Sequence, residues 1–183
     1  MSDMSRVLVI ILVSCLGFFS AEGQTLRPIP EQSTIQFTIK NMGIPVTGTI
    51  SGIQGIILFD QQNPARSDFQ VSLNSGSINT RSKARDNHIR KEDFLGVLTY
   101  PEIKFKSTKV SANPGSLEFQ VQGILTIKGI SKPIEFPFQV RKENGGYRFT
   151  GGFNINRLDF SVGESSWILS SNVVAKLNVF AAN

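Results

Sequence analysis

The sequence predicts an all-β domain, a sandwich or a barrel, with a short helical segment near one end. Three observations predict it. Apolar and polar residues alternate over most of the chain, turn residues separate the alternating runs, and one charged stretch breaks the alternation. Alternation at every second residue places the apolar side chains on one face of a strand. Many short strands at regular spacing are typical of sandwiches and barrels.

Each alternating run predicts one antiparallel strand, and turn signals lie between the runs. Asn144-Gly145 is the strongest hairpin signal, because both residues adopt positive φ at low cost. Further turn signals are Asn41-Met42-Gly43, Asn113-Pro114-Gly115 and Lys128-Gly129. In chain order, the apolar positions of the predicted strands are Ile35, Phe37 and Ile39; Phe69, Val71 and Leu73; Ile103 and Phe105; Leu117, Phe119 and Val121, continuing to Leu125 and Ile127; Ile134, Phe136, Phe138 and Val140; Tyr147, Phe149, Phe153 and Ile155; and Val173 to Ala181.

The stretch from Thr80 to Phe94 is charged and does not alternate. It predicts a short surface helix or turn segment that covers one end of the domain, ended by Gly96 and Pro101. Its basic residues form a dense patch, consisting of Arg81, Lys83, Arg85, Arg90 and Lys91. The patch is interpreted either as an ordinary solvated face or as a contact for phosphate or an anionic membrane surface.

The first residues have the pattern of an export signal. Arg6 precedes an apolar core over residues 7–19, and the small residues Ala21 and Gly23 fit a signal peptidase site. We therefore expect residues 1–23 to be a signal peptide and residues 24–183 to be one domain in the periplasm or outside the cell. The alternative is acylation at Cys15 as a lipoprotein, although the apolar core continues past this residue.

Composition argues against several classes of function. Cys15 is the only cysteine and His88 is the only histidine, so a thiolate or multi-histidine metal site is not expected. The sequence has no Gly-x-Ser-x-Gly elbow and no phosphate-binding loop. We therefore expect no catalytic residues, no metal and no cofactor. The net charge of +5 favours an anionic partner, but export and the lack of interleaved surface aromatics argue against nucleic acid.

Phenylalanine is unusually frequent, with 14 residues against one tryptophan and two tyrosines. Such stripes indicate either a packed core or the lining of a ligand cavity, and the pattern alone leaves both open. A barrel of about eight strands can hold one small ligand. A cavity lined by Phe and Ile suits a hydrocarbon better than a polar metabolite, because it offers few hydrogen-bond partners.

Four segments, in order, resemble the YceI-like family of exported, lipocalin-like proteins that bind polyisoprenoid or related long-chain lipids. They are Ser33-x-Ile35-x-Phe37 with Asn41-Met42-Gly43 and Val46-x-Gly48; Arg85-Asp86-x-His88 with Asp93-Phe94 and Tyr100-Pro101-x-Ile103-x-Phe105-x-Ser107; Gly123-x-Leu125-Thr126-Ile127-x-Gly129 with Lys132-Pro133; and Asn156-Arg157-x-Asp159-Phe160 with Val162-Gly163.

The resemblance implies an extended antiparallel lipocalin-like β-barrel of about eight strands, a deep apolar cavity and often a homodimer. It implies no catalytic residue. Two positions depart from the family pattern: Gln32 stands where a histidine is common, and Ser161 stands where glycine is frequent.

Together these observations predict an exported protein that holds an isoprenoid, quinone-like or fatty-acyl lipid for transport, storage or stress protection. The alternatives are a barrel enzyme acting on a bound lipid and a ligand-free structural or stress module. We expect polar contacts at the cavity mouth from Asp86, His88 and Arg157. The expected apolar contacts are Phe37, Ile39, Met42, Phe94, Phe105, Leu125, Phe136, Phe138, Phe153, Phe160 and Trp167.

Overall fold

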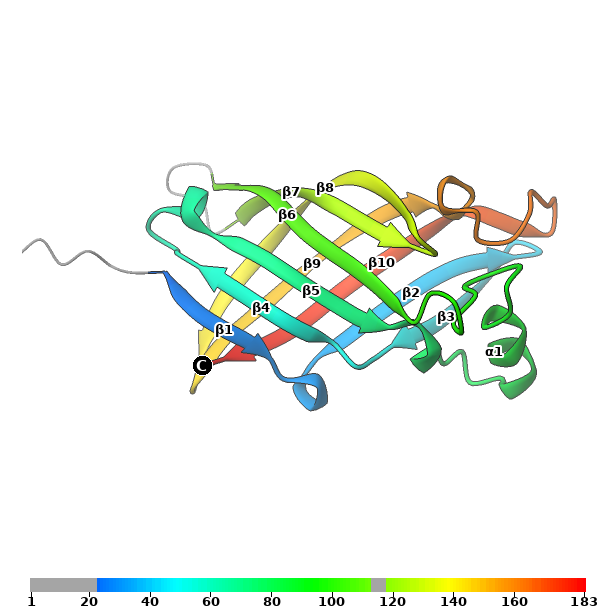
Figure 1. The fold of residues 1–183 in the computed structure, drawn as a ribbon, viewed down its shortest axis with the longest axis horizontal. Coiled ribbons are helices and arrows are strands. Elements are labelled where there is room, and N and C mark those ends of the chain that lie inside the picture. Colours follow the sequence, from blue (N-terminus) through cyan, green and yellow to red (C-terminus); the bar gives the residue numbers. More distant parts are fainter. Residues whose placement is uncertain (1–22, 113–117) are drawn as a thin grey trace, which may run out of the picture.

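The computed structural model describes residues 23–112 and 118–183. The predicted signal peptide up to residue 22, with Cys15, and the Asn113-Pro114-Gly115 turn lie outside the described residues. Figure 1 shows an elongated barrel of long, tilted strands, with the chain end at one extremity and helix α1 (Lys83–Ile89) at the other. The ten strands of the described part are β1 (Gln24–Pro28), β2 (Thr34–Asn41), β3 (Ile44–Ile50), β4 (Gln54–Phe59), β5 (Asp68–Asn74), β6 (Glu102–Ala112), β7 (Glu118–Ile127), β8 (Ile130–Glu143), β9 (Gly146–Asn156) and β10 (Leu169–Ala182).

All strand pairs are antiparallel, and the sheet closes on itself. Its order is β1-β4-β5-β6-β7-β8-β9-β10-β2-β3, and β1 also pairs with the end of β10. Eight strands therefore form the closed ring, while β2 and β3 extend from β10 as a hairpin. A bridge between Thr49 and Asn79 ties β3 to the segment before α1. The predicted fold class, an antiparallel lipocalin-like barrel with one short helix, is confirmed.

The alternating runs correspond to β2 and to β5 through β10. Three strands were not predicted, and each lacks a clean alternation. Strand β1 has only five residues, and β4 carries the continuous apolar run Ile56 to Phe59. Strand β3 contains Pro45 and Gly48, which weaken a strand prediction. Gly48 is needed there because a Cβ would collide with the ring of Phe37, its cross-strand partner.

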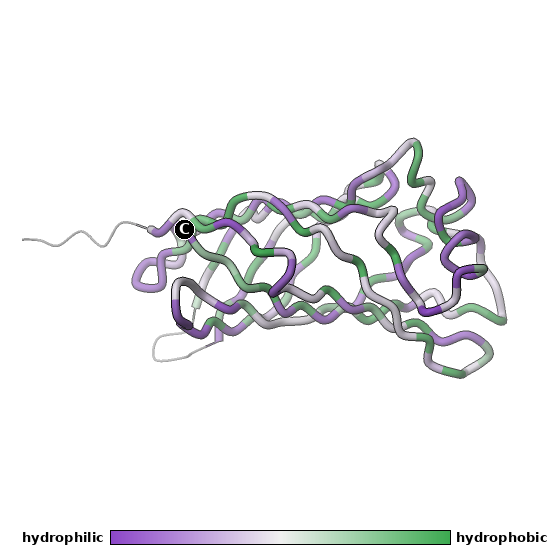
Figure 2. The backbone as a smooth tube through the Cα atoms, turned by 90° about the horizontal axis from the view of Figure 1, so that it is seen from below, coloured by the Kyte–Doolittle hydropathy of each residue, from purple (hydrophilic) through white to green (hydrophobic). Residues whose placement is uncertain are grey.

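The barrel is filled in one half and hollow in the other, so both interpretations of the phenylalanine stripes are correct, each for a different part. Near the chain end, Phe59 packs edge-on against Phe119 and Phe149, with ring centroids 5.4 Å apart in each pair. Phe69 packs against Phe138 at 5.5 Å. Edge-to-face pairs of this kind add to the stability gained from burying the rings. Figure 2 shows hydrophobic and hydrophilic positions alternating along the strands that enclose this interior.

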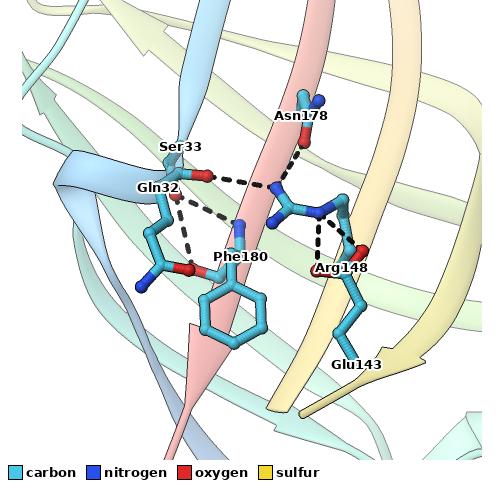
Figure 3. Close-up of polar contacts among 6 residues, drawn as sticks. All are labelled: Gln32, Ser33, Glu143, Arg148, Asn178 and Phe180. Atoms are coloured by element: carbon cyan, nitrogen blue, oxygen red, sulfur yellow. Dashed lines mark hydrogen bonds and ion pairs between the residues drawn. The ribbon is translucent and has the colours of Figure 1, made fainter. Parts of the chain in front are cut away.

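A polar network fastens the segment before β2 to the outside of this filled half (Figure 3). Arg148 pairs with Glu143 at 2.8 Å and donates to the Gln32 carbonyl and to Asn178 Oδ1. Its guanidinium also lies 5.3 Å from the ring of Phe180. Gln32, the departure from the family pattern, therefore lies outside the barrel and not among the cavity residues.

Candidate functional site

The hollow half of the barrel contains a cavity of about 470 Å³. Inward side chains of β2, β3 and β5 to β10 line its wall, and the α1 segment and the loop before β10 cover its end. Phe136 and its neighbours Phe105 and Phe153, at ring distances of 5.7 and 4.9 Å, lie where the cavity meets the filled half. The volume falls in the usual range for small-molecule sites.

The lining is almost entirely apolar because nearly all of the strand residues that reach it come from inward faces; Gln36 of β2 and Lys104 of β6 are exceptions. Along β10, Val173, Ala175 and Leu177 line the cavity, while the intervening Val174 and Lys176 do not. The bound molecule would therefore meet hydrocarbon on nearly all sides. An apolar cavity of this kind does not hold water well and favours an apolar occupant.

The structure places eight of the eleven predicted apolar residues in the cavity wall. Phe138 lies in the filled half, packed against Phe69 and Phe119. Met42 and Trp167 are 70% and 90% exposed, on the β2–β3 turn and on the loop before β10. Turn and loop positions are not governed by strand alternation, so the sequence pattern could not orient them. The eight in the wall are Phe37, Ile39, Phe94, Phe105, Leu125, Phe136, Phe153 and Phe160.

The three predicted polar residues of the mouth do not converge. His88 lines the cavity and its ring lies 4.7 Å from that of Phe94, while the side chain remains exposed. Asp86 lies outside the cavity, where its Oδ1 accepts hydrogen bonds from Thr80 N at 2.8 Å and Thr80 Oγ1 at 2.6 Å. Arg157 borders the cavity, but its donors point to backbone carbonyls.

Arg157 is only 4% exposed and organises the loop at the mouth. Its guanidinium donates to the carbonyls of Ser170, Val162, Glu164 and Leu169 at 2.6–3.2 Å. Burial lowers the pKa of Arg157, which nevertheless stays charged because arginine titrates far above neutral pH. Arg157 is thus a buried cation that holds the loop through hydrogen bonds to uncharged backbone carbonyls.

The structure also explains the second departure from the family pattern. Ser161 ends the 3-10 helix η4 (Arg157–Phe160) with φ of 52°, in the left-handed region. Glycine adopts this conformation without strain, which fits the glycine that the resemblance implies at this position. Serine adopts it at a small cost.

Several lining residues were not predicted. Val46 and Ile50 belong to the unpredicted strand β3, and their alternation with Gly48 was the signal that could have identified them. Arg85 and Asn41 also line the cavity. Asn41 Oδ1 is buried without a hydrogen-bond partner in the described part of the chain. The sequence identified Asn41 only as part of a turn signal, which does not indicate that its side chain faces the cavity.

Fewer of the five basic side chains of the patch remain exposed than the sequence suggested. Arg85 donates to Thr80 Oγ1 at 2.8 Å and to the Thr80 carbonyl at 3.0 Å. Arg90 donates to the carbonyls of Gly76 and Ile78 at 2.9 and 2.8 Å. Arg81, Lys83 and Lys91 remain exposed. Two of the five charges therefore stabilise the fold around α1.

We expect Asp86 to make the stability of the mouth depend on pH. The hydrogen bond from Thr80 Oγ1 is the main cause that holds the pKa of Asp86 below its usual value, with further help from Arg90 and Arg85. A lowered pKa stabilises the folded state above the unfolded pKa, about 3.9, and this contribution is lost as pH falls through the folded value.

The Asp86→Asn variant should therefore be less stable than the wild type at pH 7, and the difference should shrink towards pH 3. Urea unfolding across this range measures it. Asp159→Asn, at an exposed position, is the control and should show no such trend. A difference between Asp86→Asn and wild type that stays constant with pH would contradict the assignment.

Residues 23–112 and 118–183 contain no group of three His, Cys, Asp or Glu side chains placed to hold a metal ion. They also contain no helix long and apolar enough to cross a membrane.

Known proteins match both the sequence and this geometry. The model of the YceI-like domain matches residues 27–180. The chain belongs to the YceI-like family. Among curated relatives, the UPF0312 proteins of Pseudomonas aeruginosa and Yersinia enterocolitica are each 32% identical over 139 residues. This alignment covers 72% of this chain and 72% or 71% of the relative.

Solved structures share the YceI-like barrel. Burkholderia cenocepacia BcnA has a TM-score of 0.79 at 24% identity, covering 85% of this chain and 99% of its own. The Campylobacter jejuni YceI protein has a TM-score of 0.66 at 26% identity, covering 75% and 85%. A polyisoprenoid-binding domain from Saccharophagus degradans has a TM-score of 0.71 at 15% identity, covering 88% and 99%. The first and third of these likenesses support the fold.

Proposed function

We propose that this YceI-like protein is an exported lipid carrier that encloses the hydrocarbon tail of an isoprenoid, quinone-like or fatty-acyl molecule. The apolar cavity is the observation that carries the proposal. A tail would replace empty space along rings such as Phe37, Phe105 and Phe153, and each buried methylene contributes about 0.8 kcal/mol. The polyisoprenoid binding described for the Saccharophagus degradans domain agrees with this ligand class.

Polar groups at the mouth are available for a headgroup. His88 and Arg85 border the cavity from α1, and Asn41 borders it from the end of β2. The guanidinium of Arg85 still has Nη1 unused by its bonds to Thr80. The proposed orientation therefore places the tail towards Phe136 and the headgroup towards α1.

The two alternative functions have less support. A lipid-modifying enzyme needs acid and base groups that meet in the cavity, but Asp86 and Arg157 are bonded elsewhere. A ligand-free module needs a filled interior, whereas only the half near Phe138 and Phe149 is filled. Export of the carrier rests on the predicted signal peptide, residues 1–23.

Native mass spectrometry of the protein purified from its own host, with solvent extraction of the bound material, tests the proposal. We expect a stoichiometric adduct whose extracted mass is that of a long-chain lipid. A lipid-free mass that also shows no adduct after incubation with isoprenoid, quinone and fatty-acid mixtures would overturn it. Sequencing the N-terminus of the same sample checks cleavage after residue 23 against acylation at Cys15.

A further inference from the structure

Four large apolar side chains stand in solvent next to the cavity. Met42, Ile44 and Trp167 are 70%, 68% and 90% exposed, and Ile168 is exposed beside them. Met42 lies in the β2–β3 turn and Ile44 begins β3, while the other two come from the loop before β10. We call Met42, Ile44, Trp167 and Ile168 the apolar rim. Isolated exposed apolar residues are common, but a group of large ones indicates an interaction surface.

Backbone pairing places the residues of the apolar rim on neighbouring segments. The amide of Met42 donates to the Ile168 carbonyl at 2.7 Å. Asn41 pairs with Ile44 across the hairpin and with Leu169 on β10. The β2–β3 turn and the loop before β10 are thus held side by side, at the same end of the barrel as α1 (Figure 1).

The apolar rim continues the wall of the cavity. Asn41 and Leu169, which lie next to rim residues in sequence, both line the cavity, as does Val46 two residues after Ile44. The rim is also held in place, because Arg157 binds the carbonyls of Glu164 and Leu169 on either side of Trp167. A surface that touched the rim would therefore lie beside the end of the cavity that the loop before β10 covers.

The chemistry of the rim fits a lipid bilayer. Tryptophan favours the membrane–water boundary, because its ring is apolar and its N–H is polar. Lys40 is exposed beside Met42, and Arg81, Lys83 and Lys91 are exposed around α1. Exposed Glu92, Asp93, Asp159 and Glu164 oppose them at this end. Apolar insertion would therefore dominate docking, and anionic lipid would strengthen it only modestly.

We propose that the apolar rim docks this protein on a bilayer, so that the cavity mouth faces the lipid that it collects or delivers. The collection or delivery of lipid rests on the proposed carrier function, whereas docking on a bilayer does not. Trp167 is the only tryptophan of the chain, so its fluorescence reports on the rim alone. Titration with phosphatidylcholine vesicles, with and without phosphatidylglycerol, should shift its emission to the blue, and brominated lipid should quench it.

Matched variants localise the contact. Met42→Ser with Ile44→Ser keeps the fluorophore and should weaken vesicle binding at least tenfold. Trp167→Ser should weaken binding similarly in vesicle sedimentation. The control is Ile56→Ser with Ile124→Ser, two exposed apolar residues on β4 and β7 in the barrel wall, which should bind as wild type.

Three outcomes would overturn the docking proposal: no blue shift or sedimentation, equal loss in the control variant, or rim-dependent self-association without vesicle binding. Self-association of this kind would mean that the rim binds a second copy of this chain. Mass spectrometry of the same variants separates the two proposals. Rim variants that retain bound lipid but lose vesicle binding support docking. A wild type that docks but never holds lipid contradicts only the carrier function.

Discussion

Replacing Ala175 with tryptophan is expected to weaken lipid binding strongly while the barrel stays folded. Ala175 lines the cavity between its cross-strand partners Phe37 and Phe153. An indole there would occupy space that the proposed tail needs. Displacing about four methylenes, at about 0.8 kcal/mol each, costs about 3 kcal/mol, or roughly a hundredfold in affinity. Titration with a fluorescent fatty acid or isoprenoid measures the change.

Val174→Trp is the matched control for this prediction. Val174 is the preceding residue on β10 and does not line the cavity, so the same side chain there should leave affinity unchanged. Circular dichroism and urea unfolding verify that both variants are folded. Unchanged affinity of a folded Ala175→Trp protein would show that the tail does not lie in this cavity.

Replacing Arg157 with methionine should lower the free energy of unfolding by about 3 kcal/mol, the largest effect expected outside the filled core. Methionine restores much of the buried volume but leaves four carbonyls near the mouth without their donor. Unpaired buried polar groups cost about 1–3 kcal/mol each, and relaxation of the loop recovers part of this loss. Urea unfolding measures the difference.

Hydrogen exchange distinguishes a local role of Arg157 from a general loss of stability. Amides of residues 161–170 should exchange faster in Arg157→Met than global destabilisation explains. Arg148→Met is the comparison, because Arg148 binds Glu143 and Asn178 at the other end of the barrel and is more exposed. Its loss should be about 1 kcal/mol. Equal exchange at 161–170 in both variants would refute the loop-holding role of Arg157.

The strands that the sequence predicted are those whose two faces carry different residue types. In β8, Phe136 and Phe138 face inward while Glu135 and Gln139 face solvent, so the alternation shows which face is buried. Strand β4 has apolar residues on both faces and pairs with β1, which is distant in sequence. Strand β3 contains Pro45 and Gly48, so its alternation is weak although it pairs with the neighbouring β2. The charged α1 segment was predicted because nothing in it could form a half-buried strand.

The same rule separates the site residues that the sequence placed correctly from those whose partners it did not show. Phe37, Phe105, Phe136 and Phe153 were predicted because inward positions on strands follow from period two. The sequence singled out Arg157 and Asp86 but did not show what they bind. Their partners are carbonyls and a hydroxyl that the folded loops present. A sequence shows which side chains carry charge, whereas acceptor geometry arises only when the loops are placed.

The sequence by itself determined the all-β class, the position of the helical segment, the family, and the face of most strands that turns inward. These properties depend on local alternation and residue type. Only the tertiary structure decided that Phe138 fills the core while Phe136 borders a cavity, and that Met42 and Trp167 stand in solvent on one rim. The physical reason is that alternation specifies which face is apolar but not how far the opposite walls stand apart. That spacing, set by barrel closure and loop packing, decides between a core and a binding site.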